Sequence, residues 1–406
     1  MGKKLEAMGF VPLQNEVTYK NLFGNMQVWE ADSWQEASLS WKKSSYIHAG
    51  ISGGCQYIKG PDAQKLLSRI SINDVYNWKV NRCKHLVMCD ENGLIVNHAL
   101  TQRNSEEEFC MYAGNPWPII KELQTGKYNA EIIQDSCFVF QMSGTLAYEF
   151  RGPAEFGPEV YQKIWEDGQE YDLKRLGWKT YTVNHTEGGF PQMTVGFETA
   201  AVVDPVFMSV PELASVGCQK HTGSYDPADA RARLRTAGEV DWLWMARFDH
   251  DFIGREALEK EKANPKRKIV NLEWNLDDIM EIYRSHFEEG EDYKMIEFPC
   301  GQPQPAGGHA DIVSTHDGKV VGVSSCTLYS YYYRTLFSQC ILDIDQAELG
   351  NEVLVHWGDF GKKIKKARAQ PKLLQKYLRV SPGFFRFECQ PHSQQIFYIF
   401  FIRQII

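Results

Sequence analysis

Two short segments contain side chains whose chemistry differs from that of their surroundings. Residues 144–150 are largely apolar and aromatic, with a single carboxylate, Glu149. A buried Glu needs strong donors to stay ionised, and two N–H groups on a flat heterocycle would bond it in the bidentate way that a guanidinium does. Strand alternation alone favours the other interpretation, a Glu on an edge strand that faces water.

Tyr181, within residues 179–182, is the second candidate. Its phenolic group could donate a proton to a leaving oxygen. It could equally be a half-buried aromatic residue, and composition does not choose between the two.

Most signatures of other chemistries are absent from the sequence. It contains no P-loop, zincin motif or dinucleotide-binding fingerprint. The ten cysteines include no C-x-x-C pair, and the eleven histidines are scattered without a second ligand at metal spacing. We therefore predict no metal site, and cysteines that are reduced and mostly packed in apolar surroundings.

The composition bounds the class of protein. With 406 residues, 43% hydrophobic and 24% charged, the chain has room for two or three packed units. The 44 basic against 52 acidic residues give a net charge of −8, which disfavours nucleic acid as a partner. The late apolar run at residues 396–402 is far shorter than the roughly 20 residues of a membrane span. We expect a cytoplasmic protein without a membrane partner.

Local patterns predict the elements that must position these residues. A strand ending at Gly60 leads into a helix with Pro61 in its first turn and an apolar face from Ala63 to Ile70. An Asn-Gly turn at 92–93 joins two strands, 84–88 and 94–101. Further helices are predicted at 118–123, 158–169 and 277–287, and strands at 310–314, 320–324, 338–344 and 352–357. This order indicates an α+β body followed by a small β-barrel or sandwich.

Several of these segments resemble the tetrahydrofolate-dependent aminomethyltransferase (glycine-cleavage T-protein) family. Residues 55–75, with Lys-Gly-Pro-Asp-Ala at 59–63, are similar to its first strand–helix motif, and residues 251–258 to its later signature. Within the family, the chain is most similar to the O-demethylases of vanillate, syringate and 3-O-methylgallate, through residues 247–255, 275–278, 282–283, 321–324, 329–331 and 357–358.

The resemblance implies a fold and a division of the chain. The expected fold is α+β, with three lobes around a central folate channel and a C-terminal β-barrel. Residues 1–262 would form the folate-binding region, which is shorter than the family pattern near 134–142. Residues 263–366 would form the barrel, and 367–406 a divergent tail.

The resemblance also implies a reaction and its residues. A methyl group would pass from a small-molecule donor, a methoxylated aromatic acid, to the cofactor tetrahydrofolate. Glu149 matches the pterin-binding glutamate, Tyr181 matches the tyrosine assigned to catalysis, and Phe190 falls where the demethylases carry a tryptophan beside the pterin. Three alternatives stay open: an aminomethyltransferase, a folate-dependent demethylase of a methylamine or sulfonium, and a folate-binding scaffold without turnover.

Overall fold

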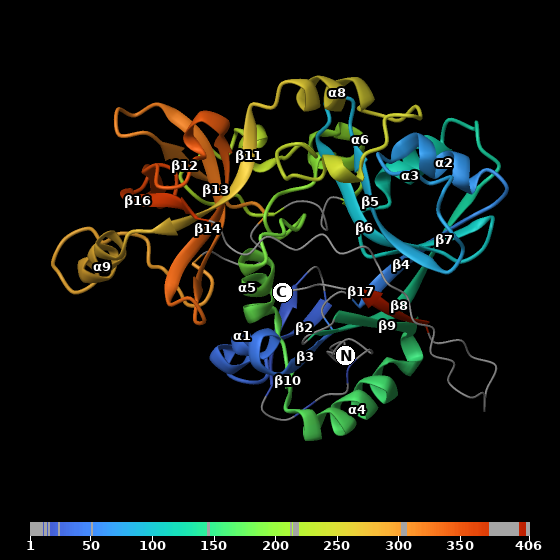
Figure 1. The fold of residues 1–406 in the computed structure, drawn as a ribbon, viewed down its shortest axis with the longest axis horizontal. Coiled ribbons are helices and arrows are strands. Elements are labelled where there is room, and N and C mark those ends of the chain that lie inside the picture. The colour runs from blue at the N-terminus through green and yellow to red at the C-terminus, as the bar shows by residue number, and fades with distance from the viewer. Residues whose placement is uncertain are drawn as a thin grey trace.

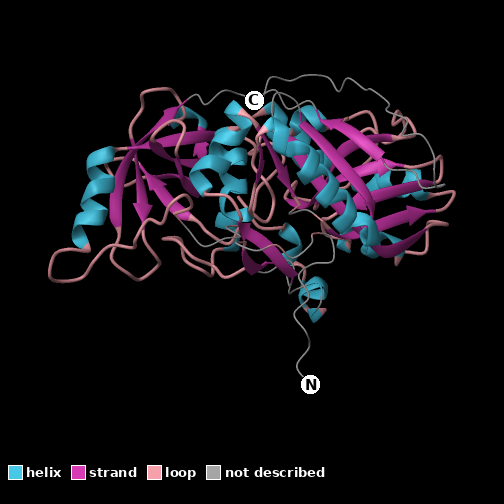
Figure 2. Ribbon diagram, turned by 90° about the horizontal axis from the view of Figure 1, so that it is seen from below, coloured by secondary structure: helices cyan, strands magenta, loops and turns pink. Residues whose placement is uncertain are grey.

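The computed structural model describes residues 17–22, 25–49, 52–143, 147–211, 219–301, 307–372 and 398–402, together with residues 11, 14 and 213. Residues 144–146 of the predicted carboxylate segment, and most of the predicted tail, therefore lie outside the described residues. The described chain forms three lobes, of which two share a large sheet and the third is a closed barrel (Figure 1). Helices lie between the strands of the barrel and those of the large sheet (Figure 2).

Within the described residues the large sheet has nine strands. Its main path runs β10-β3-β8-β4-β7-β6-β5, and β9 pairs with both β8 and β17. The pairing of β10 with β3 is parallel, whereas the other pairs in this sheet are antiparallel. The strands are β3 (Ser45–His48), β4 (Gly53–Lys59), β5 (Arg82–Cys89), β6 (Ile95–Arg103), β7 (Glu108–Tyr112), β8 (Glu131–Ser143), β9 (Ala147–Pro153), β10 (Leu173–Arg175) and β17 (Tyr398–Ile402).

The predicted strand and helix around Gly60 are confirmed as β4 and α2 (Ala63–Ile70). Gly60 has φ +125°, and a Cβ there would lie 2.5 Å from the carbonyl oxygen of Asn129, so the turn requires glycine. The helix begins after Asp62, so the placement of Pro61 in its first turn was wrong. The apolar face is buried as expected, since Ala63, Leu66, Leu67 and Ile70 are at most 1% exposed.

The predicted hairpin is confirmed as β5 and β6. The carboxylate of Asp90 accepts hydrogen bonds from the backbone N–H groups of Asn92 and Leu94, both at 2.9 Å. These bonds close the Asn-Gly turn and fix the register of the two strands, so that Val87 lies directly opposite His98.

The helices pack on the sheet and connect it to the barrel. α4 covers one face of the sheet through Tyr161 and through the predicted Val160, Ile164 and Trp165. α5 lies in the middle of the molecule (Figure 1) and contacts α1, β2 and β13. Besides α2, the described helices are α1 (Trp34–Lys43), α3 (Trp117–Leu123), α4 (Gly157–Gly168), α5 (Trp178–Glu187), α6 (Pro205–Met208), α8 (Arg255–Ala263) and α9 (Leu276–Ser285). Short 3-10 helices lie at Ala154–Phe156, Gln169–Tyr171, Ala200–Val203, Ala230–Arg233, Leu243–Met245 and Ile344–Gln346.

The predicted C-terminal β-barrel is confirmed. Six strands close it in the order β11-β14-β13-β12-β15-β16. They are β11 (Arg267–Trp274), β12 (Asp311–Ser314), β13 (Val320–Ser330), β14 (Thr335–Asp343), β15 (Val353–Trp357) and β16 (Lys365–Lys372), while β1 (Thr18–Leu22) and β2 (Asn25–Glu30) form a separate pair. Alternating apolar residues of these strands fill the barrel, with Trp274 and Trp357 packed edge to face at 5.7 Å.

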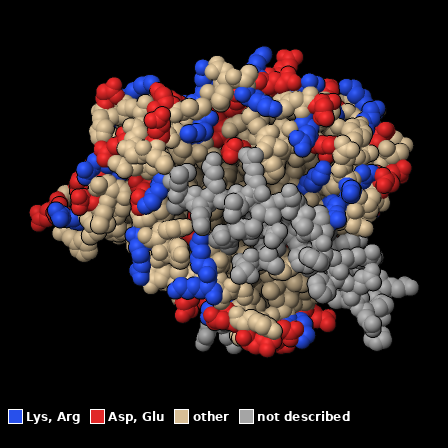
Figure 3. All heavy atoms as spheres, viewed as in Figure 1, with Lys and Arg blue, Asp and Glu red and all other residues tan. Residues whose placement is uncertain are grey.

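On the visible face, the described residues carry both signs of charge. Lys and Arg are interspersed with Asp and Glu over the barrel and the outer parts of the large sheet (Figure 3). None of the helices that the structure describes has the length and apolar character needed to cross a bilayer.

Candidate functional site

Tyr181 lies in the interior rather than on the surface. It is on the first turn of α5 and only 2% exposed. Its ring stacks on the imidazole of His48 with centroids 4.1 Å apart and planes 15° apart, and Trp178 packs edge-on at 5.0 Å. The helix start is fixed by Gly177, where a Cβ would lie 2.3 Å from the carbonyl oxygen of Trp29. Tyr181 is therefore held in one orientation by its packing.

His48, the stacking partner of Tyr181, ends β3 and is 2% exposed. Its Nδ1 lies 2.7 Å from the carbonyl oxygen of Leu176. A carbonyl only accepts, so Nδ1 carries the proton of the neutral ring and Nε2 presents a bare lone pair. Nε2 is buried and has no hydrogen-bond partner among the described residues. Burial lowers the pKa of His48 to about 3, so the ring is neutral at physiological pH.

Glu149 is buried in the centre of β9, at 2% exposure, so the interpretation of a water-facing edge residue was wrong. The side chain of Gln141 donates to one carboxylate oxygen at 3.0 Å, and the guanidinium of Arg151 pairs with the other. Arg151 is itself 1% exposed. Gln141 and Arg151 thus supply part of the donor set that was expected from a ligand of Glu149.

Strand register places His48, Gln141 and Glu149 in one row. His48 lies opposite Gln141 in the β3–β8 pair, and Gln141 lies opposite Glu149 in the β8–β9 pair. Directly opposed residues of antiparallel strands point to the same face of a sheet. Tyr181 packs on the His48 end of this row, so the row links the predicted tyrosine to the predicted glutamate.

Phe190 lies just after α5 in a cluster of aromatic rings. It stacks on Trp242 with centroids 5.7 Å apart, and the rings of His85, His98 and His185 lie within 6.0 Å of it. His185 is also 4.4 Å from the ring of Tyr181, which joins Phe190 to the predicted catalytic residue.

These residues are neighbours around one region of the interior. Strand register connects His48 to Gln141, and Arg151 lies near His85, because its guanidinium donates to Cys83 at 2.9 Å, two residues before His85 on β5. We call the eight residues the site ring: His48, Gln141, Glu149, Arg151, His85, Phe190, His185 and Tyr181.

The histidines of this region were missed as a group by sequence reasoning, which treated them as scattered. His85 and His98 lie 3.0 Å apart between Nδ1 and Nε2. The predicted hairpin contains both residues on its two strands, so its register was a usable signal. His185 follows Tyr181 by four residues, the spacing of one helix face. No comparable local signal places His48 beside them.

Burial keeps these imidazoles uncharged. It lowers the pKa of His85 and of His185 to about 4, and that of His98 well below its ordinary value. The charge of Arg151 lowers the pKa of His85 further. At neutral pH the formal charges of the site ring are therefore those of Glu149 and Arg151.

The described residues were compared with the arrangements that metal binding and cysteine chemistry require. Across the described ranges, no group of three or more His, Cys, Asp or Glu is arranged to hold a metal ion. The eight cysteines within those ranges are free, and all but Cys83 are buried.

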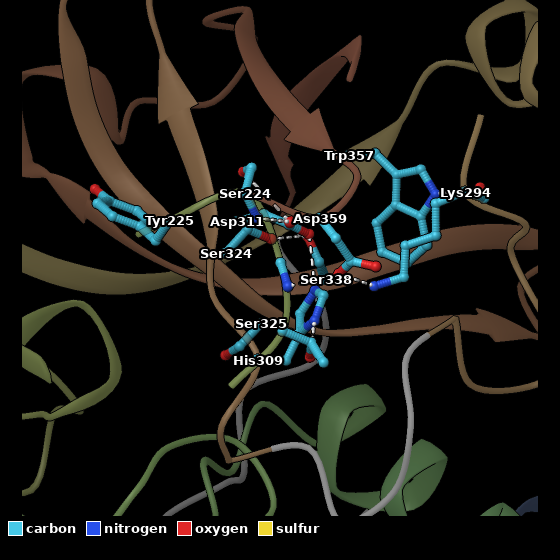
Figure 4. Close-up of polar contacts among 12 residues, drawn as sticks. Ser224, Tyr225, Lys294, His309, Asp311, Ser324, Ser325, Ser338, Trp357 and Asp359 are labelled. Atoms are coloured by element: carbon cyan, nitrogen blue, oxygen red, sulfur yellow. Dashed lines mark hydrogen bonds and ion pairs between the residues drawn. The ribbon is translucent and has the colours of Figure 1, made fainter. Parts of the chain in front are cut away.

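A second buried polar cluster joins the loop at residues 219–226 to the barrel (Figure 4). Asp311 accepts from His309 Nε2 at 2.9 Å and from the backbone N–H of Ser224 at 3.1 Å. The Thr222 hydroxyl lies 3.0 Å from His309 Nδ1, which gives the order of a hydrolase triad. However, both ring nitrogens of His309 and both carboxylate oxygens of Asp311 already have partners within the cluster, so we interpret it as a structural joint.

Comparisons with known proteins agree with the fold and with the segments described above. The GCVT N-terminal domain matches residues 52–127, which contain β4, α2 and the β5–β6 hairpin. Sesamin methylene transferase of a Sinomonas strain is 28% identical over 89% of both chains. The chain is thus similar in sequence to the glycine-cleavage aminomethyltransferase family.

Other members of this group match over different lengths. Syringate O-demethylase of a Sphingobium strain is 23% identical over 88% of this chain and 89% of its own. The aminomethyltransferase of Thermotoga maritima is 27% identical over 53% of this chain and 63% of its own. Aminomethyltransferase T of the glycine cleavage system of Bartonella henselae has the same fold, with a TM-score of 0.62 over 90% of this chain and 96% of its own at 13% identity. The chain therefore has the glycine-cleavage T-protein fold, and the matches support one-carbon transfer as its general class of activity.

Proposed function

We propose that this protein transfers a methyl group from a methoxylated aromatic acid to tetrahydrofolate. The observation that carries the proposal is the site ring, which joins the buried Tyr181 to the buried Glu149 through His48 and Gln141. A buried proton donor and a buried carboxylate in one ring are the two groups that such a transfer needs from the protein.

The donor set of the site ring fits a pterin. Glu149 offers carboxylate oxygens to ring N–H groups, and Phe190 offers an aromatic face beside Trp242. Because Arg151 pairs with Glu149, its guanidinium must turn away or share the carboxylate when the pterin binds. Tetrahydrofolate, when bound, supplies the nitrogen that accepts the one-carbon group.

Tyr181 would act on the leaving group. When the bond between the methyl carbon and the aryl oxygen breaks, that oxygen becomes a phenolate and needs a proton. Tyr181 is held rigidly by His48 and Trp178, and the neutral imidazoles around it add no positive charge. We therefore assign to Tyr181 the donation of a proton to the departing oxygen.

Two relatives bear on the choice of donor. By their names, one acts on syringate as an O-demethylase and the other moves a methylene group of sesamin. Both cover nearly the whole chain, whereas the aminomethyltransferases cover about half of it. A methylene bridge between aryl oxygens is accordingly the second candidate donor.

The proposal is tested by product formation. Purified protein is incubated with tetrahydrofolate and vanillate, syringate, 3-O-methylgallate or a methylenedioxybenzoate, and the folate products are separated by chromatography. Methyl-tetrahydrofolate from a methoxylated acid supports the proposal. Folate binding by calorimetry without any product would favour a scaffold that has lost turnover.

Tyr181→Phe tests the assigned proton donor. Because general acids contribute about 10²- to 10⁴-fold, we expect kcat to fall by about that factor while folate binding is retained. Tyr171→Phe is the matched control, since Tyr171 is 69% exposed. An unchanged rate in Tyr181→Phe would remove Tyr181 from the chemistry.

A further inference from the structure

The Nε2 atom of His48 is an acceptor that the described protein leaves unsatisfied. Its side chain is buried, and Nδ1 is committed to the carbonyl of Leu176 at 2.7 Å. Nε2 has no hydrogen-bond partner among the described residues. A buried acceptor without a donor is costly, so such an atom in a candidate site points to a donor on a ligand.

We propose that His48 recognises a free phenolic hydroxyl adjacent to the methoxy group of the one-carbon donor, accepting its hydrogen bond at Nε2. The inference rests on the proposed function and deepens it, because it names which aryl ethers the site selects. His48 is thereby a specificity-determining residue that contacts substrate.

The place of His48 in the row distinguishes the aromatic donor from the pterin. Two strand spacings separate β3 from β9, which is roughly 9–10 Å between His48 and Glu149 at the backbone. Glu149 lies at the end assigned to the pterin, whereas the ring of His48 stacks directly on Tyr181. A ligand group that reaches Nε2 is therefore beside the residue assigned to the breaking ether bond.

The tautomer of His48 decides which donors fit. A phenolic hydroxyl next to the ether carries the hydrogen that a bare lone pair requires. A methylenedioxy ring, or an aryl ether without the hydroxyl, has no hydrogen to give and would leave Nε2 buried without a partner. A site built to bond a substrate hydroxyl can reject the analogue that lacks it by large factors. His48 thus favours methoxyphenols over the second candidate donor.

The test compares substrates that differ in the adjacent hydroxyl. Rates of aryl product formation with tetrahydrofolate are measured for vanillate, 3-methoxybenzoate and 3,4-methylenedioxybenzoate, which share the carboxylate. For the wild-type chain we expect kcat/KM to be at least tenfold higher for vanillate than for either analogue. Equal values for vanillate and 3-methoxybenzoate would overturn the inference while leaving the proposed function intact.

Two variants locate the preference at His48. His48→Phe keeps a flat ring against Tyr181 but removes the acceptor, so we expect kcat/KM to fall at least several-fold more for vanillate than for 3-methoxybenzoate, which brings the ratio of the two values close to one. His48→Gln restores an acceptor oxygen and should regain part of the preference. A loss on both substrates by the same factor would show a packing role only and would overturn the inference.

Binding separates failure of this inference from failure of the proposed function. If the wild-type chain forms no product from any donor, the proposed function fails, and calorimetry with vanillate and 3-methoxybenzoate still tests His48. Tighter binding of vanillate that is lost in His48→Phe would support a phenol-recognising site without turnover. Equal binding of the two acids, or binding of neither, would overturn the inference about His48 in addition to the proposed function.

Discussion

The side chains around Tyr181 form an interior that is polar in composition but carries little charge. Four imidazoles lie within or against the site ring, and burial lowers the pKa of each: His48, His85, His98 and His185. Neutral imidazoles donate and accept hydrogen bonds without attracting anions. The site is therefore suited to uncharged ring systems that are aligned by hydrogen bonds and stacking.

The lowered pKa of His185 predicts how stability depends on pH. The pKa of His185 is about 4 in the folded chain and about 6.5 when unfolded, so the unfolded state binds the proton more readily. The stabilisation is present above pH 6.5 and is lost as pH falls towards 4. In His185→Gln we expect the slope of unfolding free energy against pH in this window to decrease by about 1.4 kcal/mol per pH unit.

Urea unfolding at pH 4.5, 5.5, 6.5 and 7.5 measures this slope. His316→Asn serves as the control, because the side chain of His316 is 60% exposed and pairs with Glu352 at the surface. A slope that is the same in His185→Gln and in the wild-type chain would contradict the prediction.

The Glu149–Arg151 pair predicts strong coupling between two residues. Removing one partner leaves the other charge buried and unpaired, which typically costs about 3–5 kcal/mol of unfolding free energy. We expect Glu149→Gln to show a loss of this size, and the double variant with Arg151→Gln to lose less than the sum of the two single variants. Chemical denaturation of the four proteins measures the coupling. Additive losses would show that the two side chains do not depend on each other.

Sequence patterns identified Tyr181 and Glu149 as candidates but not their surroundings. Glu149 and Arg151 are two residues apart on β9, so strand alternation places both side chains on one face, and this local signal was not used. The opposition of His48 and Gln141 depends instead on the register between β3 and β8. These two strands are far apart in the chain, and their register is set by tertiary packing, which no local pattern encodes. The roles proposed for Tyr181, Glu149 and Phe190 remain predictions.

Elements were predicted well where local chemistry determines them. The β4–α2 unit follows from glycine at the turn and a 3.6-residue apolar period, and the β5–β6 hairpin from the Asn-Gly turn. In contrast, β16 and the pairing of β17 with β9 were not predicted. Both depend on distant partners, since β16 pairs with β11 and β15, and β17 pairs with a strand from the first half of the chain.

The pairing of β17 with β9 predicts the effect of a C-terminal deletion. Each described residue of β17 has a partner on β9, and Phe400 lies opposite Glu149. Deleting residues 398–406 would turn β9 into an edge strand. We expect faster amide hydrogen exchange across residues 147–153 and more aggregation, measured by mass spectrometry and light scattering. A deletion of 403–406 alone is the control, and identical exchange in both truncated chains would argue against the pairing.

At the scale of the whole molecule, the joint of Figure 4 ties the first region of the chain to the barrel. Asp311 holds both His309 and the backbone of Ser224, and all three are buried. The fold class and the barrel were predicted correctly, because the resemblance and the β-rich pattern of the C-terminal half indicate the same fold. The joint was not predicted, because Ser224 and Asp311 lie far apart in the sequence. The predicted domain boundaries stay predictions.

Asp311→Ala tests whether this joint holds the two parts together. It leaves the His309 ring and the Ser224 N–H without their acceptor, so we expect a loss of about 2–5 kcal/mol in unfolding free energy. Thermal unfolding by calorimetry should show a lower midpoint. Asp345→Asn, at an exposed position before β15, is the control. Equal midpoints for Asp311→Ala and the wild-type chain would refute a structural role.

The pairing of β9 with β17 also sets the order in which the sheet can be completed on the ribosome. β9 ends at Pro153, whereas its outer neighbour β17 begins only at Tyr398 and is therefore synthesised much later. At about 5–20 residues per second, the interval lasts on the order of tens of seconds. Throughout that time the outer edge of β9, next to Glu149, is open to strands of other nascent chains. Slower initiation or a lower expression temperature should therefore raise the yield of correctly paired protein more than a stabilising change in the barrel would.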